Sequence, residues 1–167
     1  RRRHTRFRNV TGVQTCALPI SLFSGSLAWA QGRCPTTPPI AGASPSDWNG
    51  WGADSANTRS QTKGGLSAEG APKLRLKWAF GFPGARAVSG QPTVAGGRVF
   101  VSADTGEVYA LDAATGCTYW SFKAEGAVRS AVVLERLAAG KPYAVFFGDA
   151  RANAYAVDAM TGVQVWK

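Results

Sequence analysis

The sequence predicts an all-β chain that contributes about two four-stranded antiparallel blades to a β-propeller. The first observation is an internal repeat: residues 108–120 and 154–166 share the pattern Tyr-Ala-x-Asp-Ala-x-Thr-Gly-x-x-x-Trp at an offset of 46 residues. A period in the forties is typical of propeller blades. The second is the alternation of apolar and polar residues in short runs separated by turn residues, which is the pattern of half-buried strands.

Four strands are expected in each repeat unit. In the first unit they cover residues 91–95, 98–103, 107–112 and 117–123, with turns at 96–97, 104–106 and 115–116. In the second unit they cover residues 131–137, 142–148, 153–158 and 163–167, with turns at 139–141 and 149–151. Trp78 precedes Trp120 by 42 residues and shares its Trp-x-Phe continuation, so one more outer strand is expected before the first unit.

The residues that the two units share favour a mechanical role in the blade over a catalytic one. An aspartate at a turn accepts hydrogen bonds from turn N–H groups, a glycine permits positive φ, and a tryptophan docks on the neighbouring blade. The predicted motif residues are Asp112, Thr115, Gly116 and Trp120 in the first unit and Asp158, Thr161, Gly162 and Trp166 in the second.

The first thirty residues are excluded from the fold analysis. Residues 10–20 back-translate codon by codon into a sequencing-adaptor oligonucleotide, so residues 1–20 are interpreted as adaptor-derived. Residues 21–30 read as the remnant of a signal peptide that ends in Ala28-Trp29-Ala30, which predicts export to the periplasm or beyond. The apolar run is too short for a membrane-spanning helix. Residues 31–75 are then a leader, and residues 76–167 are the blades.

The net charge of +9 does not indicate a nucleic-acid-binding protein. Five arginines and no acidic residue lie in residues 1–30, so more than half of the excess charge belongs to the excluded segment. The remaining basic residues are scattered, without the clustering and aromatic interleaving of a phosphate-binding groove. The sequence therefore predicts neither a nucleic-acid partner nor a membrane span.

Cys34 and Cys117 are the cysteines of the expected mature chain, and an oxidising compartment permits them to pair. A bridge would tie the leader to the first blade and close a long loop, a stabilisation of about 4 kcal/mol in the chain-entropy model. The alternative is two unrelated thiols. Metal binding is not predicted, because the sequence has no CxxC or CxxCH motif and its one histidine, His4, lies in the excluded segment.

The repeats resemble those of the eight-bladed quinoproteins that hold pyrroloquinoline quinone (PQQ). The same repeat occurs in non-enzymatic propellers, such as the lipoprotein scaffold for outer-membrane protein assembly, so that alternative stays open. Residues 48–59, Trp-Asn-Gly-Trp-Gly-Ala-Asp-Ser-Ala-Asn-Thr-Arg, resemble the segment that opens the propeller of the dehydrogenases. Residues 76–84, Leu-Lys-Trp-Ala-Phe-Gly-Phe-Pro-Gly, are similar to the version in polyvinyl-alcohol dehydrogenases.

The resemblance implies a fragment of a periplasmic alcohol dehydrogenase that uses PQQ and calcium and passes electrons to a cytochrome c. The acid that precedes the first inner strand in known dehydrogenases has no counterpart in residues 88–92, and their vicinal cysteine pair has none in residues 126–131. No catalytic or metal-binding residue is assigned. Arg129 follows a turn at the mouth of an inner strand, where a guanidinium could bind quinone carboxylates, and is the candidate cofactor-binding residue. Arg151 is a weaker candidate for the same role.

Overall fold

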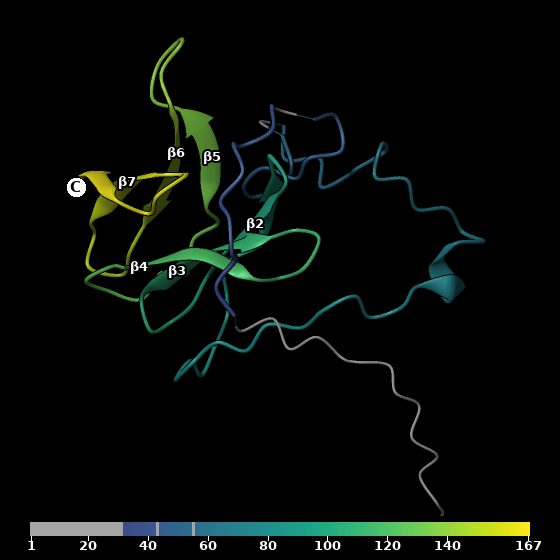
Figure 1. Ribbon diagram of the computed structural model, residues 1–167, viewed down its shortest axis with the longest axis horizontal. Coiled ribbons are helices and arrows are strands. Elements are labelled where there is room, and N and C mark those ends of the chain that lie inside the picture. Colours follow the sequence, from purple (N-terminus) through teal and green to yellow (C-terminus); the bar gives the residue numbers. More distant parts are fainter. Residues whose placement is uncertain (1–31, 43, 55) are drawn as a thin grey trace, which may run out of the picture.

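The computed structural model describes residues 32–42, 44–54 and 56–167, and its strands form two antiparallel four-stranded sheets (Figure 1). Blade 1 contains β1 (Thr93–Ala95), β2 (Arg98–Ser102), β3 (Glu107–Asp112) and β4 (Thr118–Lys123). Blade 2 contains β5 (Val133–Arg136), β6 (Tyr143–Gly148), β7 (Ala154–Asp158) and β8 (Gln164–Trp166). A single 3-10 turn, η1 (Ala71–Lys73), is the one helical element of the described residues. The predicted fold class and the two predicted blades are confirmed.

Each strand expected within the two repeat units is present, with ends that differ from the prediction by one or two residues in most cases. The largest differences are at β1 and β5, each of which starts two residues later than predicted. At β5 the reason is that Val132 does not pair with a strand. Its carbonyl instead accepts a hydrogen bond from the Thr93 hydroxyl of blade 1.

The last strand of each blade contains a β-bulge at the same place. Ala110 pairs with Trp120 but Leu111 pairs with Thr118, so Tyr119 is an extra residue in β4. In blade 2 the register shifts in the same way between Ala156 and Val157. A bulge locally reverses which side of the sheet the following residue faces.

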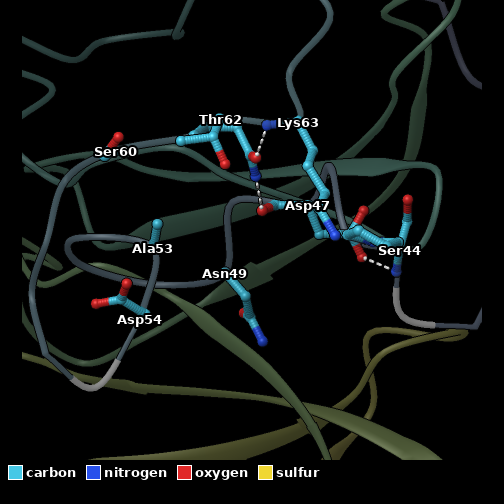
Figure 2. Close-up of a pocket in the computed structure, with 10 residues that line it drawn as sticks. Ser44, Asp47, Asn49, Ala53, Asp54, Ser60, Thr62 and Lys63 are labelled. Carbon is cyan, nitrogen blue, oxygen red and sulfur yellow. Dashed lines mark hydrogen bonds between the residues drawn. The ribbon is translucent and has the colours of Figure 1, made fainter.

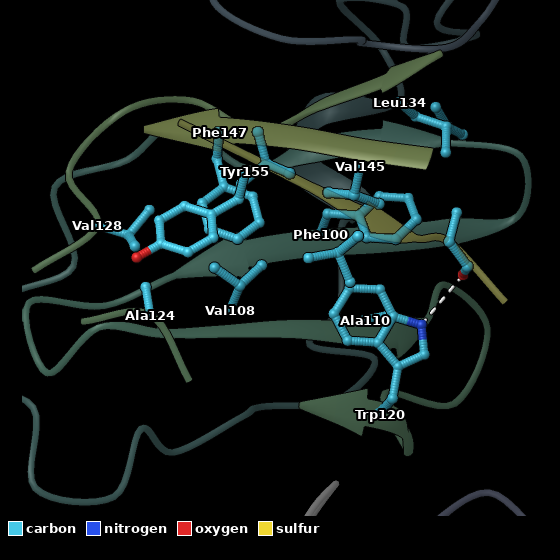
Figure 3. Packing of buried hydrophobic residues seen from close by; sticks show 14 residues of the cluster. Phe100, Val108, Ala110, Trp120, Ala124, Val128, Leu134, Val145, Phe147 and Tyr155 are labelled. Atoms are coloured by element: carbon cyan, nitrogen blue, oxygen red, sulfur yellow. Dashed lines mark hydrogen bonds between the residues drawn. The ribbon is translucent and has the colours of Figure 1, made fainter. Parts of the chain in front are cut away.

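The main hydrophobic core lies between the two blades (Figure 3). Both sheets contribute apolar residues with at most 6% of their surface exposed, and the tryptophan among them comes from blade 1. The large members are Phe100, Val108, Trp120, Leu134, Val145, Phe147, Tyr155 and Val157. The two sheets therefore fold as one unit that shares a core.

Residues 78–80 pack on blade 1 as residues 120–122 pack on blade 2. The Trp120 indole donates to the Ala159 carbonyl at 3.0 Å, and the Trp78 indole donates to the Ala113 carbonyl at 3.3 Å. Ala113 and Ala159 occupy equivalent positions in the two repeats. The outer strand predicted before blade 1 is not formed, since these residues join neither sheet, but Trp78 makes the same contact as Trp120.

The adaptor-derived and signal-peptide segments predicted for residues 1–30 lie outside the described residues. Within those that are described, the leader crosses the edge of blade 1 and then runs between β1 and β5 (Figure 1). The described part of the chain contains no helix that is long and apolar enough to cross a membrane.

Candidate functional site

The candidate site is a hollow of about 290 Å³ at the end of blade 2 where β5 begins. The loop before β5 and the β6–β7 turn form its walls. The lining residues are Ala127, Arg129, Ser130, Gly148, Asp149 and Ala150. The sequence-predicted candidate Arg129 therefore lies in a hollow, beside residues that sequence reasoning did not single out.

Two hydrogen bonds, one of them from a side chain, hold the two walls of this hollow together. The Ser130 hydroxyl donates to the Gly148 carbonyl at 3.1 Å, and the Ala150 N–H donates to the Ala127 carbonyl at 2.9 Å. The Val128 N–H donates across to Ala103 of blade 1 at 3.3 Å. Arg129 thus projects from a loop whose backbone is fixed on both sides.

The Arg129 side chain is exposed, and it makes no hydrogen bond or ion pair with the described residues. A guanidinium presents donors in a planar fork that suits a carboxylate or phosphate. The hollow therefore offers a free cationic donor to an anionic ligand. Arg151 differs, because its side-chain stem lies over Gly126, with Cγ 3.0 Å from the position of a Cβ built on that glycine.

Asp149 lines the same hollow, but its carboxylate is fully engaged as a turn acceptor. It accepts from the N–H groups of Gly126, Arg151 and Asn153 and from the Tyr155 hydroxyl at 2.9–3.0 Å. Burial alone would raise the pKa of Asp149, but the hydrogen bonds from Asn153, Tyr155 and Arg151 outweigh it and hold the pKa well below its ordinary value. A carboxylate held in this way is ionised and poorly suited to act as a general base.

The shared aspartate, threonine and glycine lie at the turn between the third and fourth strands of each blade, and the shared tryptophan lies within the fourth strand. Asp112 accepts from the N–H groups of Ala114 and Thr115 at 3.0 and 2.7 Å and from the Thr115 hydroxyl at 2.7 Å. Asp158 accepts in the same way from the next residues of blade 2, including the N–H and hydroxyl of Thr161 at 2.8 Å. None of these groups faces the hollow of Arg129.

The turn glycines also serve the packing of the tryptophans. Gly116 and Gly162 both adopt φ of 75°, in the left-handed region that favours glycine. At Gly162 an added Cβ would lie 2.9 Å from the ring of Trp120. The turn of blade 2 therefore needs a glycine both for its backbone and for the tryptophan that docks on it.

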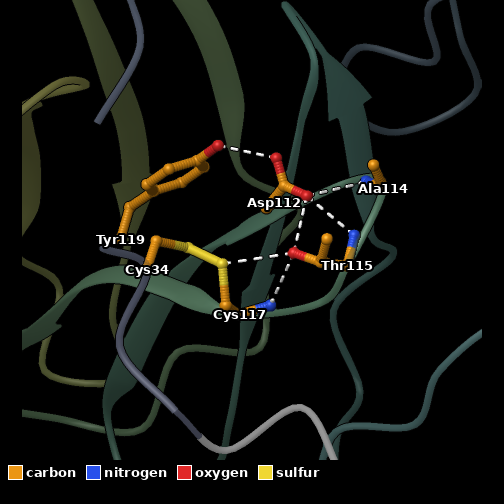
Figure 4. Close-up of a disulfide and its surroundings, with 6 residues drawn as sticks. All are labelled: Cys34, Asp112, Ala114, Thr115, Cys117 and Tyr119. Atoms are coloured by element: carbon orange, nitrogen blue, oxygen red, sulfur yellow. Dashed lines mark hydrogen bonds between the residues drawn. A yellow bond between two sulfur atoms is a disulfide. The ribbon is translucent and has the colours of Figure 1, made fainter. Parts of the chain in front are cut away.

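Cys34 and Cys117 form a disulfide that joins the leader to blade 1 (Figure 4). The leader backbone continues the contact, since the Cys34 N–H donates to the Thr118 carbonyl at 3.0 Å. Tyr119, next along β4, donates its hydroxyl to Asp112 at 2.6 Å. Burial and this hydrogen bond raise the pKa of Tyr119 to about 12, and the same bond, with those from Thr115, lowers the pKa of Asp112.

Arg98 is a buried residue that sequence reasoning missed. Only 1% of its surface is exposed, and its guanidinium lies 4.1 Å from the Tyr119 ring centroid and donates to the Pro38 carbonyl of the leader at 2.8 Å. The one sequence signal for Arg98 is a difference between the repeats, because blade 2 has Ala144 at the equivalent position. Its role is to hold the leader.

A second hollow, of about 480 Å³, lies within the leader and is lined mostly by polar side chains (Figure 2). Several of these groups bond within the leader: Asp47 accepts from the Ser44 N–H, and Gln61 donates to the Asp47 carbonyl. Asn49 is committed to blade 2 by two hydrogen bonds with Leu134. The lining therefore supports the leader's own shape.

Metal-ligating side chains do not gather in the part of the chain that the structure describes, where no group of three or more His, Cys, Asp or Glu residues could hold an ion. The hollow of Arg129 suits one edge of an anionic cofactor such as PQQ, because it supplies an unengaged guanidinium. Calcium ligands are assigned to no residue of this chain.

Comparison with known proteins agrees with this architecture. The PQQ_2 family profile, described as outer membrane protein assembly factor BamB, matches residues 24–167. A polyvinylalcohol dehydrogenase of Pseudomonas sp is 50% identical over 132 residues, 78% of this chain and 20% of that protein. A second, of Sphingopyxis sp. (strain 113P3), is 45% identical over 138 residues, 81% of this chain and 21% of that protein. This chain thus spans about a fifth of these relatives.

A solved structure adds the propeller context. The quinohemoprotein alcohol dehydrogenase of Comamonas testosteroni superimposes with a TM-score of 0.63 at 29% identity, covering 72% of this chain and 19% of that one. The repeats, the two blades with their docked tryptophans and the profile match lead to one conclusion: the chain belongs to the PQQ_2 family of PQQ-repeat β-propeller proteins.

Proposed function

We propose that this chain is part of a PQQ-dependent alcohol dehydrogenase that oxidises secondary alcohols of the polyvinyl-alcohol type. The observation that carries the proposal is the identity of 50% and 45% to two polyvinylalcohol dehydrogenases across most of the chain. Residues 31–75 serve as the leader and residues 76–167 as two blades of the complete propeller.

Arg129 is the residue of this chain that holds the cofactor in this proposal. Its exposed guanidinium projects from a loop tied to both Gly148 and blade 1, and it has no competing acceptor among the described residues. A bidentate contact with a carboxylate would orient the cofactor at the hollow. When bound, PQQ supplies the acceptor for the two electrons removed from the alcohol, while the protein supplies binding and orientation.

The compartment and the electron acceptor are further parts of the proposal. The signal-peptide pattern before Gln31 supports export, and a periplasmic location fits the Cys34–Cys117 disulfide, since disulfides persist in oxidising compartments. A cytochrome c is the proposed acceptor of the electrons. One relative, a 1-butanol dehydrogenase (cytochrome c) of Thauera butanivorans that is 30% identical over 126 residues, supports this assignment.

The experiment uses the full-length polypeptide that contains this chain, without its signal peptide. PQQ and calcium are titrated while dye reduction by polyvinyl alcohol and by a small secondary alcohol is followed. Saturable, cofactor-dependent dye reduction supports the dehydrogenase. A folded propeller that does not bind PQQ contradicts it and favours the scaffold that the description of the family profile suggests.

The Arg129→Ala variant tests the cofactor contact. Loss of one charged hydrogen-bonding group costs roughly 1.5 to 3 kcal/mol, so PQQ affinity should fall about tenfold to a hundredfold. Arg129→Lys keeps the charge but lacks the planar fork, and should recover part of the affinity. Arg75→Ala removes an exposed arginine of the leader that does not line the hollow, so it is the matched control and should leave affinity unchanged. Equal PQQ affinity of Arg129→Ala and the parent would remove Arg129 from the cofactor site.

A further inference from the structure

Three consecutive leader residues, 48–50, lie between the inner strands of the two blades and bond to both. Trp48 pairs with Val94 of β1 through two backbone hydrogen bonds of 2.7 and 2.8 Å. The next residue, Asn49, uses both ends of its side-chain amide on Leu134 of β5. Its Nδ2 donates to the Leu134 carbonyl at 2.7 Å, and its Oδ1 accepts from the Leu134 N–H at 2.9 Å. Asn49 thus substitutes for a pairing strand at the edge of β5.

Gly50 continues the link toward the start of β5. Its N–H donates to the Thr93 hydroxyl of β1 at 3.0 Å, and that hydroxyl donates to the Val132 carbonyl. Thr93 and Val132 are both fully buried, so water does not compete for these bonds. At Gly50, φ is 81° and an added Cβ would lie 3.0 Å from the Val133 side chain, which leaves little room for any other residue.

These bonds meet at the loop that carries Arg129. On one side of Arg129, the Val128 N–H donates to Ala103 of blade 1 at 3.3 Å. On the other side, the Ser130 carbonyl accepts from Ser102 of blade 1 at 3.4 Å, and the Val132 carbonyl accepts from Thr93. The loop is therefore held against blade 1 on both sides of its guanidinium-bearing residue, and the leader reinforces one of the two sides.

We propose that Asn49, supported by Trp48 and Gly50, is a positioning residue that holds β5 and the loop of Arg129 in place against blade 1. The leader can do this because its own course is anchored upstream. The Cys34–Cys117 disulfide, the Arg98 bond to the Pro38 carbonyl and the Ala41 N–H bond to Gly96 at 3.2 Å fix it along the edge of blade 1. The relevance to cofactor binding rests on the proposed function, whereas the mechanical claim does not.

The test compares Asn49→Ala, Asn49→Asp and Gln61→Ala in the full-length polypeptide. Gln61 is the matched control, because its side-chain amide also donates to a backbone carbonyl, but to that of Asp47 within the leader, at 2.8 Å, and not to a blade. Residue-resolved amide hydrogen exchange is measured without cofactor at Leu134 and at Val128. PQQ affinity is then measured by titration of the same variants.

In Asn49→Ala the exchange rate of the Leu134 amide should rise about tenfold, because its acceptor is lost, and that of the Val128 amide should rise several-fold. Asn49→Asp keeps an acceptor for the Leu134 N–H but loses the donor, so its exchange should be intermediate. Gln61→Ala should match the parent at both amides. PQQ affinity of Asn49→Ala should fall roughly threefold to tenfold while Arg129 itself is intact.

Unchanged exchange at Leu134 would overturn the proposal, because Asn49 would then not hold β5. Faster exchange at Leu134 with parental exchange at Val128 would also overturn it, since Asn49 would merely cap one strand edge. Loss of protection at both amides with unchanged PQQ affinity would support the mechanical claim and contradict its relevance to cofactor binding. A parent protein that fails to bind PQQ contradicts the proposed function alone, and the exchange comparison still decides the mechanical claim.

Discussion

Trp120 of blade 1 and Trp166 of blade 2 occupy the same position in their repeats, yet one is buried and the other is not. Each packs against a phenylalanine of its own blade, Phe100 or Phe146, with ring centroids 6.1 Å apart. Trp120 is 4% exposed because blade 2 covers it, whereas Trp166 is 44% exposed. The tryptophan of the motif therefore stabilises the fold mainly through its contact with the turn of the next repeat. This is expected where stability is a sum of contacts between neighbouring repeats.

The two blades also differ in the residues that contact the leader. Blade 1 has Arg98, Cys117 and Tyr119 where blade 2 has Ala144, Val163 and Val165. The three residues of blade 1 form one group around the leader, through the buried guanidinium, the disulfide and the aromatic ring between them. The two blades thus share their strands and their motif, and the sequence of blade 1 differs where the leader packs on it.

Truncation of the two tryptophans gives the largest expected difference between the blades. Trp120→Ala should lower the free energy of unfolding by roughly 3 to 5 kcal/mol, because it empties the shared core. In this chain, Trp166→Ala should cost clearly less than Trp120→Ala, because Trp166 is 44% exposed and only its own blade covers it. Urea unfolding of both variants checks this. Equal losses would contradict the view that the neighbouring blade supplies the energy.

Removal of the disulfide probes the outer edge of blade 1. The Cys34→Ser, Cys117→Ser double variant should lose about 4 kcal/mol, because the bridge closes a loop between residues 83 positions apart and so restricts the unfolded chain. Thermal or urea unfolding under oxidising conditions measures the loss. Val163→Ser, at the blade 2 position equivalent to Cys117, is the control and should have a small effect. A double variant as stable as the parent would mean that the other leader contacts suffice.

The β2–β3 and β6–β7 turns carry different residues, Gly106 and Ala152, at equivalent positions, so each can be replaced by the residue of the other blade. Gly106 has φ of 91°, and an added Cβ would lie 2.7 Å from the Gly126 carbonyl, so Gly106→Ala should destabilise by roughly 2 kcal/mol. Blade 2 has Ala152 at the equivalent position with φ of 62°. Ala152→Gly should therefore stabilise by less than about 1 kcal/mol, because relief of the left-handed backbone exceeds the added freedom of the unfolded chain. Opposite signs in urea unfolding are the expected result.

The pH dependence of Asp112 gives the smallest expected effect. Its pKa is lowered in the folded state, first by the Tyr119 hydroxyl, so its contribution to stability is complete above the ordinary value of 3.8 and disappears as pH falls below it. Asp112→Asn should cost about 1 kcal/mol at neutral pH and lose this acid dependence. Tyr119→Phe should weaken the same dependence but not abolish it, because the bonds from Thr115 and Ala114 remain. The measurement is the free energy of unfolding of the parent, Asp112→Asn and Tyr119→Phe from pH 7 to pH 2.5. The same pH dependence in all three proteins would contradict the role of Asp112.

The two blades were predictable because the repeat shows strands, turns and motif residues twice in the sequence. Arg129 could be chosen for the same reason, from its place before a predicted inner strand. The leader contacts could not be predicted, because Asn49 acts on Leu134, which is 85 residues away in the sequence. The burial of Arg98 depends likewise on Pro38 and Met160, which only the folded chain brings together. The pairing of Cys34 with Cys117 stayed open in the sequence because no local pattern fixes a distance between them.

The bulge in the last strand of each blade determines which face of the sheet the motif tryptophan lies on. Three residues separate the turn glycine from the tryptophan, and one of them, Tyr119 in β4, has no cross-strand partner. Because of this extra residue, Thr118 and Trp120 face opposite sides of the sheet although they are two positions apart in the sequence. A regular strand over the same residues would turn Trp120 toward the side of Thr118, away from the core that it shares with blade 2. The bulge, as much as the side chain, therefore decides which blade the tryptophan joins.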